Sequence, residues 1–201
     1  LKRRYGLQET VIKPWVIHTI SKGESNIDEI IGDLEELSNP TVGLLAHPGQ
    51  TDIRVTAKAG SLAEAEQMMA PVLQRIREQL GKYIYGENET TLEEAVGRLI
   101  ADHHISVEII EVGTKGEILS KLKSQVPDLA NGEFIDSYVS NETLKTLLKE
   151  SQAQQNADLA LGVRLVSNGD KQDLLLVLRG EEIIKEGERS YGGPPGDGQI
   201  W

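Results

Sequence analysis

The sequence has 201 residues, which is enough for one large domain or two small ones. Its 38% apolar and 26% charged residues suit a globular protein, and no apolar run approaches the roughly 20 residues that a membrane helix needs. The absence of cysteine excludes disulfides, thiolate catalysis and zinc–cysteine sites, and we expect a cytoplasmic protein without membrane attachment.

The net charge of −11 is concentrated in the second part of the chain. Residues 1–85 hold 10 Lys/Arg against 11 Asp/Glu, whereas residues 86–201 hold 11 against 21. Nucleic-acid affinity comes mostly from cations that neutralise phosphates. We therefore do not expect nucleic acid as a partner of the second part, and the near-neutral first part should bind it weakly.

The first elements of the chain are a strand and a helix. Residues 15–20 predict a strand, which either pairs with a later strand or is the tail of a preceding domain. Ser25 is the expected cap of a helix, because acidic residues follow it in the first turn and an apolar stripe runs behind them. Asn39-Pro40 ends this helix.

A hairpin and a second helix follow. The runs 41–46 and 51–57, joined by a Pro-Gly turn, predict two antiparallel strands. Ser61 and Glu64 form a capping box at the start of the helix that Gly81 ends. Residues 21–86 therefore predict an α–β–β–α unit, which we expect to dock onto its neighbour through residues 83–86.

The second part is organised around a strand, a glycine turn and a helix. Residues 105–112 alternate between polar and apolar side chains, which predicts a strand with one buried face. Residues 113–116, Gly-Thr-Lys-Gly, break that strand, and an apolar helical stripe follows. A turn of this kind exposes backbone N–H groups at the start of a helix, where α/β proteins place nucleophiles, phosphates and oxyanions.

The remaining elements predict a layered α/β domain with helices on both faces of the sheet. A helix at 91–103 precedes the central strand. The segments that follow it are a strand at 134–139, a helix at 141–155 capped by Asn141, strands at 157–166 and 173–178, of which the second should be buried on both faces, and a polar edge strand at 181–191.

Four short motifs in the first half resemble one family in order and spacing: Lys22-Gly-Glu-Ser25, Asn39-Pro-Thr-Val42, Arg54-Val-Thr-Ala-Lys58 and Gly81-Lys-Tyr-Ile-Tyr-Gly86. They resemble the middle region of CinA, the competence/damage-inducible protein. The resemblance implies a KH-type α+β domain at 21–86, followed at 88–201 by a three-layer α/β/α C-terminal domain. In active members of the family that domain is a nicotinamide-nucleotide amidohydrolase.

The resemblance also implies that residues 1–20 are a linker or the tail of a missing N-terminal domain. In the family that domain is molybdopterin-binding-like and linked to ADP-ribose pyrophosphatase activity. The first residue is Leu1 instead of methionine, and we expect a processed piece or an expressed fragment of a longer protein. The sequence does not decide whether the last domain is cut short after Trp201.

The amidohydrolase motif of the family is Ala-Glu-Ser-Cys-Thr-Gly-Gly, with the serine as nucleophile. Residues 110–116 match it at Glu111, Thr114 and Gly116, but Val112 stands in the place of the serine. Amide hydrolysis through an acyl-enzyme needs a nucleophile and a base that activates it, and valine can be neither. Removing a serine nucleophile typically costs about 10⁶-fold in rate.

Two further motifs also differ. The Tyr-Ser-Asn-x-x-Lys motif, whose lysine takes the proton of the serine, keeps Ser140 and Asn141, but Leu144 replaces the lysine. Lys145 lies one position later, which on a helix turns it about 100° away. Where the third motif, Thr-Gly-x-Ala-Gly-Pro, should follow residues 157–163, the chain has Arg164-Leu-Val-Ser-Asn.

We therefore expect no catalytic residue, metal or cofactor in this chain. Residues Glu111, Val112, Thr114, Gly116, Ser140, Asn141 and Lys145 should form a vestigial pocket in a structural, oligomerisation or nucleotide-binding module. A homo-oligomer and a nicotinamide or adenine nucleotide are the expected partners.

Two alternatives stay open. Thr114, Ser140 or Lys145 could have been recruited for residual deamidation of nicotinamide mononucleotide. Alternatively, the Gly-Thr-Lys-Gly segment could be the Gly-x-x-Gly loop of a nucleic-acid-binding KH module. That second alternative requires a helix at 105–112 in place of the predicted strand.

Overall fold

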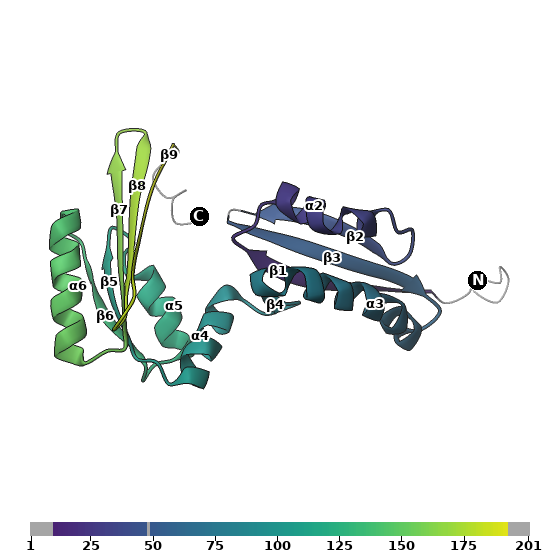
Figure 1. Ribbon diagram of the computed structural model, residues 1–201, viewed down its shortest axis with the longest axis horizontal. Helices are drawn as coiled ribbons and strands as arrows, with labels where there is room; N and C mark the ends of the chain where they lie inside the picture. Colours follow the sequence, from purple (N-terminus) through teal and green to yellow (C-terminus); the bar gives the residue numbers. More distant parts are fainter. Residues whose placement is uncertain (1–9, 48, 193–201) are drawn as a thin grey trace, which may run out of the picture. The chain divides into compact units, whose positions relative to one another are not determined.

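The computed structural model describes residues 10–47 and 49–192, and the chain divides into two compact units after Leu92. Each unit has its own sheet (Figure 1), and we describe each by itself. Among the helices in the described ranges, none is both long enough and apolar enough to span a membrane.

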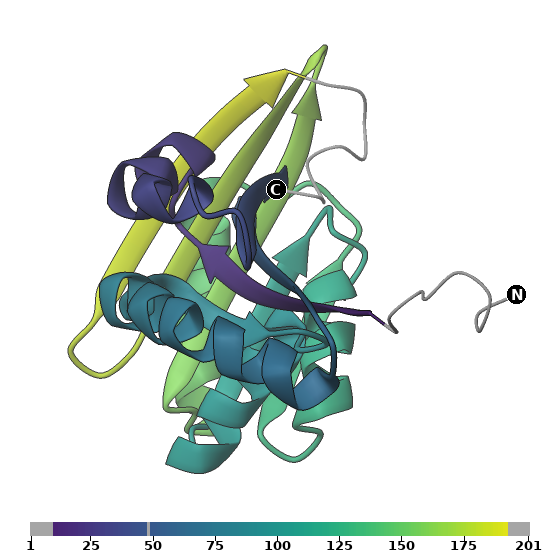
Figure 2. The same ribbon diagram turned by 90° about the vertical axis from the view of Figure 1, so that its right-hand side faces the viewer.

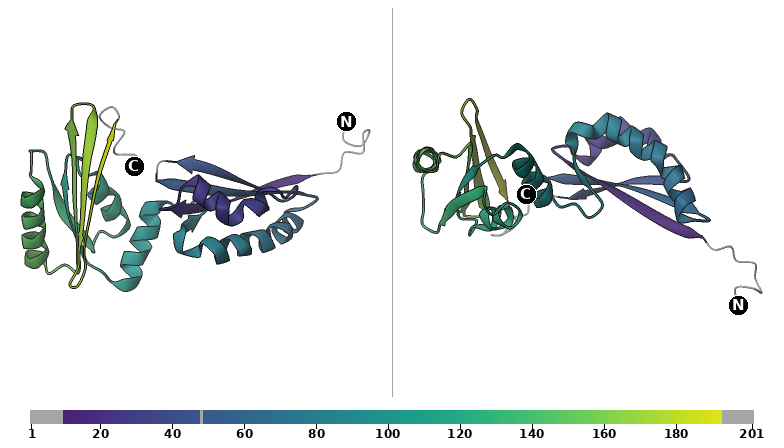
Figure 3. Two further views of the ribbon diagram at one scale, coloured as in Figure 1. Left: turned by 45° about the horizontal axis from the view of Figure 1, so that its top comes forward. Right: turned by 90° about the horizontal axis from the view of Figure 1, so that it is seen from below.

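The first unit is a four-stranded antiparallel sheet with two helices on one face, in the strand order β2-β3-β1-β4. Figure 3 shows α2 and α3 on the same side of the sheet. The elements are β1 (Val11–Ile20), α2 (Glu24–Glu35), β2 (Thr41–His47), β3 (Gln50–Ala59), α3 (Leu62–Leu80), the 3₁₀ turn η1 (Gly81–Tyr83) and β4 (Ile84–Glu87).

The alternation of the strands explains the one-sided core of this unit. In β3, Ile53, Val55 and Ala57 are buried beneath the helices, and the residues between them lie on the open face. On α3, Met69 and Ile76 are fully buried on the face that covers the sheet. The predicted hairpin and second helix are confirmed.

Four expectations for the first unit need correction. Residues 11–20 form β1, which pairs with β3 and β4 inside the sheet, so the first strand of the unit lies ahead of the predicted boundary. The order is therefore β–α–β–β–α–β. Residues 84–87 form β4 and pair with β1 in the same sheet. The cap of α2 is Gly23 instead of Ser25. Ser61 caps α3 as predicted, since its hydroxyl accepts from the backbone N–H of Glu64, but the Glu64 carboxylate accepts from the backbone N–H of Gly60 instead of that of Ser61.

The second unit is a mixed five-stranded sheet in the order β6-β5-β7-β8-β9. Strand β5 is parallel to β6 and β7, whereas β8 and β9 continue the sheet antiparallel; Figure 2 shows β7, β8 and β9 as long neighbouring strands in green to yellow. The elements are α4 (Leu92–His103), β5 (Val107–Val112), α5 (Glu117–Gln125), β6 (Ala130–Ile135), α6 (Asn141–Gln155), β7 (Leu159–Asn168), β8 (Lys171–Arg179) and β9 (Ile184–Gly192).

Helices cover both faces of this sheet, as predicted. Helix α6 packs on one face, where Leu144 and Leu148 meet Ile110 of β5. Helices α4 and α5 pack on the other, where Ile100 and Leu122 belong to the cluster around the buried side chains of β5 and β6. Figure 1 shows α6 on one side of the sheet and α4 and α5 on the other.

The second unit also departs from prediction. All six residues of β5 are buried, so the expected exposed face does not exist. Strand β6 lies at 130–135 instead of 134–139, and Ser140 instead of Asn141 caps α6. Strand β8 is not buried on both faces, because Leu176 on the face opposite α6 is 40% exposed.

Candidate functional site: the turn between β5 and α5

The carboxylate of Glu111 holds the turn together from inside the protein. Glu111 lies near the end of β5 and is fully buried. It accepts a hydrogen bond from the hydroxyl of Thr114 (2.5 Å) and others from the backbone N–H groups of Leu119 (2.5 Å) and Ile118 (3.2 Å). A carboxylate at this position satisfies N–H groups that the helix itself cannot, and it complements the positive end of the helix dipole.

The glycines of the turn allow neighbouring backbone to approach closely. Gly113 has a φ of +79°, and a side chain there would collide with the carbonyl oxygen of Leu165 in β7. Gly116, the N-cap of α5, has a φ of +75° and lies against the ring of Phe134. Only glycine adopts these dihedrals without strain. Because glycine has no side chain, β6 and β7 can also pack directly against the turn.

Val112 occupies an apolar interior position. Its side chain is 3% exposed and belongs to the cluster of Ile110, Val139 and Leu144 beneath α6. Thr114 is also buried, and its hydroxyl donates a hydrogen bond to the carboxylate of Glu111. The turn therefore presents two side chains with assigned structural partners.

The start of α6 is tied to the edge strand β9. The amide of Asn141 donates to the carboxylate of Glu188 (3.2 Å), and the ammonium of Lys145 lies 2.8 Å from the carboxylate of Glu186. The hydrogen bond to Glu186 raises the pKa of Lys145. Ser140 accepts from the backbone N–H of Thr143 as the helix cap.

The position that the resemblance assigns to the general base is Leu144. This side chain is fully buried in the same cluster as Val112. Asn141 has one buried oxygen, Oδ1, without a hydrogen-bond partner among the described residues. The structure thus brings Val112 and Leu144 together, but as packing partners in an apolar core.

The segment that departs from the third motif is the continuation of a strand. Strand β7 runs on to Asn168 and turns directly into β8. Within it, the guanidinium of Arg164 donates to the backbone carbonyl of Val139 (2.6 Å) and lies 5.2 Å from the ring centre of Tyr138. A regular strand therefore occupies the place of the third motif.

The sequence reasoning missed several polar partners of the predicted residues. Glu186 and Glu188 bind the start of α6 from a strand that was predicted only as a polar edge. Successive side chains of a strand point to opposite faces, so Glu186 and Glu188, two positions apart, both point to the α6 face. No local signal identifies such partners, because they lie about 40 residues from the helix in sequence. By contrast, a Glu followed by a Gly-Thr turn and a helix does suggest a carboxylate near the helix start.

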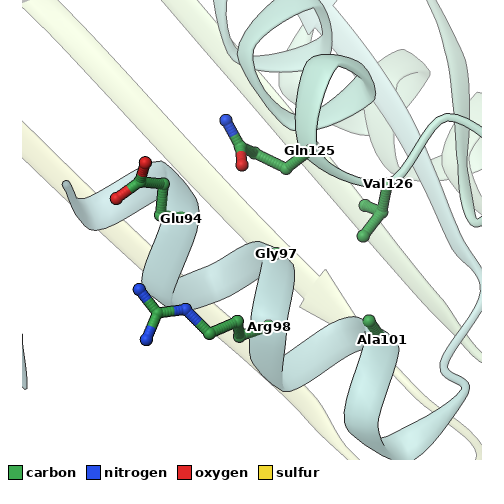
Figure 4. Close-up of a pocket in the computed structure, with 6 residues that line it drawn as sticks. All are labelled: Glu94, Gly97, Arg98, Ala101, Gln125 and Val126. Carbon is green, nitrogen blue, oxygen red and sulfur yellow. The ribbon is translucent and has the colours of Figure 1, made fainter. Parts of the chain in front are cut away.

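Three surface hollows of the second unit have no residue of the turn 113–116 in their lining. One, of about 320 Å³, is lined by α4 and the far end of α5 (Figure 4), where Gly97 lies opposite Gln125. Helix α5 has nine residues and is therefore about 13 Å long, which separates this hollow from Gly116. Two others run along α6, and Lys145, Lys149 and Arg179 are among the residues that line them.

The alternative that the turn is a nucleic-acid-binding Gly-x-x-Gly loop required a helix at 105–112. Residues 107–112 are instead an interior strand of the sheet, between β6 and β7. The condition for that alternative is not met.

Comparisons with known proteins identify a family for the first unit and relatives that match larger parts of the chain. Residues 15–86 match the family described as "Damage-inducible protein CinA KH domain". A "Putative competence-damage inducible protein" of Clostridium novyi is 33% identical over 175 residues, which is 81% of this chain and 42% of that protein. A "CinA-like protein" of Dictyoglomus turgidum is 39% identical over 113 residues, or 56% of this chain and 28% of that protein.

Among solved structures, the competence/damage inducible protein CihA from Agrobacterium tumefaciens is similar to part of the chain. It is 15% identical, with a TM-score of 0.44 over 54% of this chain and 86% of that one. The chain spans less than half the length of the Clostridium novyi and Dictyoglomus turgidum relatives.

Proposed function

The chain belongs to the CinA family through the KH domain of its first unit, and on that premise we propose that its second unit is an amidohydrolase-type module that does not hydrolyse amides. The observation that carries this proposal is the environment of Val112. A nucleophile must reach its substrate and contact a base. Val112 is instead an apolar side chain packed against Ile110 and Leu144.

The polar groups near the turn support the same conclusion. Residual hydrolysis would need Thr114, Ser140 or Lys145 as nucleophile or base. Thr114 donates to a carboxylate in the interior, and Ser140 accepts the N–H that it caps. The ion pair with Glu186 raises the pKa of Lys145, whereas a lysine acting as a base needs a lowered one.

For the remaining role of the second unit we favour association with a second copy of the chain. Three apolar side chains of the β8–β9 region are exposed: Leu176 by 40%, Ile183 by 49% and Ile184 by 62%. Leu176 lies on the face opposite α6, whereas Ile184 pairs with Arg179 and lies on the α6 face, so this region carries exposed apolar side chains on both faces of the sheet. Exposed apolar side chains mark interaction sites. The mass in solution, from light scattering, should be that of a homo-oligomer, and Leu176→Glu with Ile184→Glu should reduce it to that of the monomer.

We also propose that the second unit binds a nicotinamide or adenine nucleotide. Binding of such a nucleotide without turnover would fit a module that has kept its nucleotide pocket but lost its catalytic residues. Calorimetric titration with nicotinamide mononucleotide measures this separately from hydrolysis.

The decisive experiment is the formation of ammonia and nicotinic acid mononucleotide from nicotinamide mononucleotide. We expect neither product from the wild type, nor from Val112→Ser, because that variant still lacks a base. Val112→Ser with Leu144→Lys restores at most a trace. Wild-type turnover that is lost in a Thr114→Ala, Ser140→Ala double variant would establish the enzyme alternative. Turnover that persists in that variant would reveal another nucleophile.

A further inference from the structure

Two lysines from separate parts of the first unit converge on one tyrosine ring. Lys22 lies in the loop between β1 and α2, and Lys82 lies beside Tyr83 in η1, ahead of β4. The ammonium nitrogens are 5.1 Å (Lys22) and 4.9 Å (Lys82) from the ring centre of Tyr83. Both distances are within the range of cation–π contacts. The residues come from two of the four motifs on which the family resemblance rests.

Neither ammonium forms an ion pair with a carboxylate of the described residues. Within the described part of the chain, no carboxylate lies within 4.0 Å of either lysine, although Glu24 follows two positions after Lys22. By contrast, two cations of α3 are closely paired, since Arg75 lies 2.7 Å from Asp33 and Arg77 lies 2.7 Å from Glu87. Two like charges held at one ring repel each other, and an anion placed there would relieve that repulsion.

The phenol of Tyr83 reports this local positive charge. Its pKa is lowered, first by the hydrogen bond with Lys82 and also by the charge of Lys22. The phenol hydroxyl can also donate a hydrogen bond to an oxyanion. The start of α2 lies directly after Lys22, and no side chain of the described residues caps it. Its first N–H groups therefore add further donors in this region.

We propose that Lys22, Lys82 and Tyr83 form a binding site for a compact phosphate-bearing anion, of the class of a nucleotide diphosphate. The two cations meet at a single ring. This arrangement suits a small dianion, because a nucleic-acid strand requires cations spaced along its backbone. The site lies wholly in the first unit and is independent of the role proposed for the second.

The test is a titration of the full chain with inorganic pyrophosphate, followed by NMR of protein labelled with ¹³C at the tyrosine Cζ. Tyr83→Phe assigns the signal of Tyr83. We expect that signal to shift saturably, and the pKa of Tyr83 to rise in the complex because the anion neutralises the cations that lower it. Lys22→Gln and Lys82→Gln should each weaken binding about tenfold, because each removes a charge-assisted contact.

The matched control is Lys58→Gln, which removes an exposed lysine of β3 that has no aromatic contact in the described ranges. It should change the affinity less than twofold. An equal loss in Lys58→Gln would reduce the effect to general surface charge and overturn the site, as would a Tyr83 signal unmoved by millimolar pyrophosphate. A ten-residue oligothymidylate that binds more tightly than pyrophosphate, and depends on the same two lysines, would overturn the assignment to a small anion.

Discussion

The polar residues of the two sheets lie in opposite environments, exposed on an open face in the first and buried in the second. In the first unit, helices cover one face only, and β3 places Asp52, Arg54 and Lys58 on the open face. In the second unit, helices cover both faces, and the polar residues of β5, Glu108 and Glu111, are buried with the rest of the strand. Alternating polar and apolar residues therefore lie on an open and a covered face in β3, whereas in β5 both sets of side chains lie in the interior.

This difference shows what a polar residue in a strand must have when it is not on a surface. Glu111 has three hydrogen-bond donors around its carboxylate. Glu108 has one, the hydroxyl of Ser151 at 2.7 Å, and its other oxygen has no partner among the residues described. A buried carboxylate is tolerated only with such partners, so Glu111 makes the turn a fixed part of the second unit.

The largest effect on this contrast should come from Gly113→Ala. The new side chain would collide with the carbonyl oxygen of Leu165, and the φ of +79° disfavours alanine. We expect a loss of at least about 3 kcal/mol, enough to unfold the second unit, because backbone cannot move aside as a side chain can. Hydrogen exchange of β5 and of β3 measures the two units separately.

The control for that variant is Gly169→Ala in the β7–β8 turn. Gly169 has a φ of +64° but has no atom of the described structure within 4 Å of an added side chain. It should therefore lose only about 1 kcal/mol, from the dihedral alone. Equal losses at the two glycines would show that the close approach of β7 to the turn is not what matters.

A smaller effect should separate the two valines Val112 and Val16. Val112→Ser places a hydroxyl in an apolar cluster and should cost about 2 kcal/mol. Val16 lies on the open face of β1 and is half-buried, so Val16→Ser should cost less than about 1 kcal/mol. Denaturant unfolding of the two variants measures the difference, and a Val112→Ser protein as stable as the wild type would mean that polar groups are accommodated at this position.

The smallest expected effect concerns His18 on the open face of the first unit. Its ring nitrogens face two acceptors, the carboxylate of Asp52 at 2.7 Å and the carbonyl of Asn88 at 2.6 Å. Each acceptor favours a proton on the ring nitrogen that faces it, so together they favour the charged imidazolium. Burial lowers the pKa of His18, but the hydrogen bonds to Asn88 and Asp52 outweigh it, and the pKa is raised.

A raised pKa stabilises the folded state below the ordinary value of 6.5, and this contribution is lost as the pH rises through the folded pKa. We expect the stability of the first unit to fall by about 1 kcal/mol across that range. His18→Gln should abolish the dependence. His47→Gln, which removes the more distant partner of Asp52 (3.2 Å), should retain it, and a wild-type profile that is flat or rises would contradict the charged ring.

Local patterns predicted the hairpin, α3 and the glycine turn because each depends on neighbouring residues. Strand β1 was predicted to begin at residue 15, directly after Pro14. A proline has no N–H to donate to a neighbouring strand. Pro14 pairs only with β3, and the described residues of β4 reach no further than Ile17. Its missing N–H therefore faces no partner strand. Such an edge is a property of the sheet and is invisible in the sequence.

The residues of the candidate site were predicted by resemblance, but their partners were not. Glu111 and Thr114 bond to each other and to α5, and Lys145 bonds to Glu186 of β9. These partners depend on how distant segments pack. The motif positions could therefore be located from the sequence, whereas the residues that they bond to in the fold could not.

The claim that the turn is kept for architecture is tested most directly by the stability of Glu111→Gln. Its matched control is Glu117→Gln, which removes the same charge from an exposed position in the first turn of the same helix. The account predicts that Glu111→Gln destabilises the second unit by about 2–3 kcal/mol, through the loss of charge-assisted hydrogen bonds. Glu117→Gln should cost under about 1 kcal/mol, through the helix dipole alone. Equal losses in the two variants, measured by denaturant unfolding with hydrogen exchange of β5, would contradict the account.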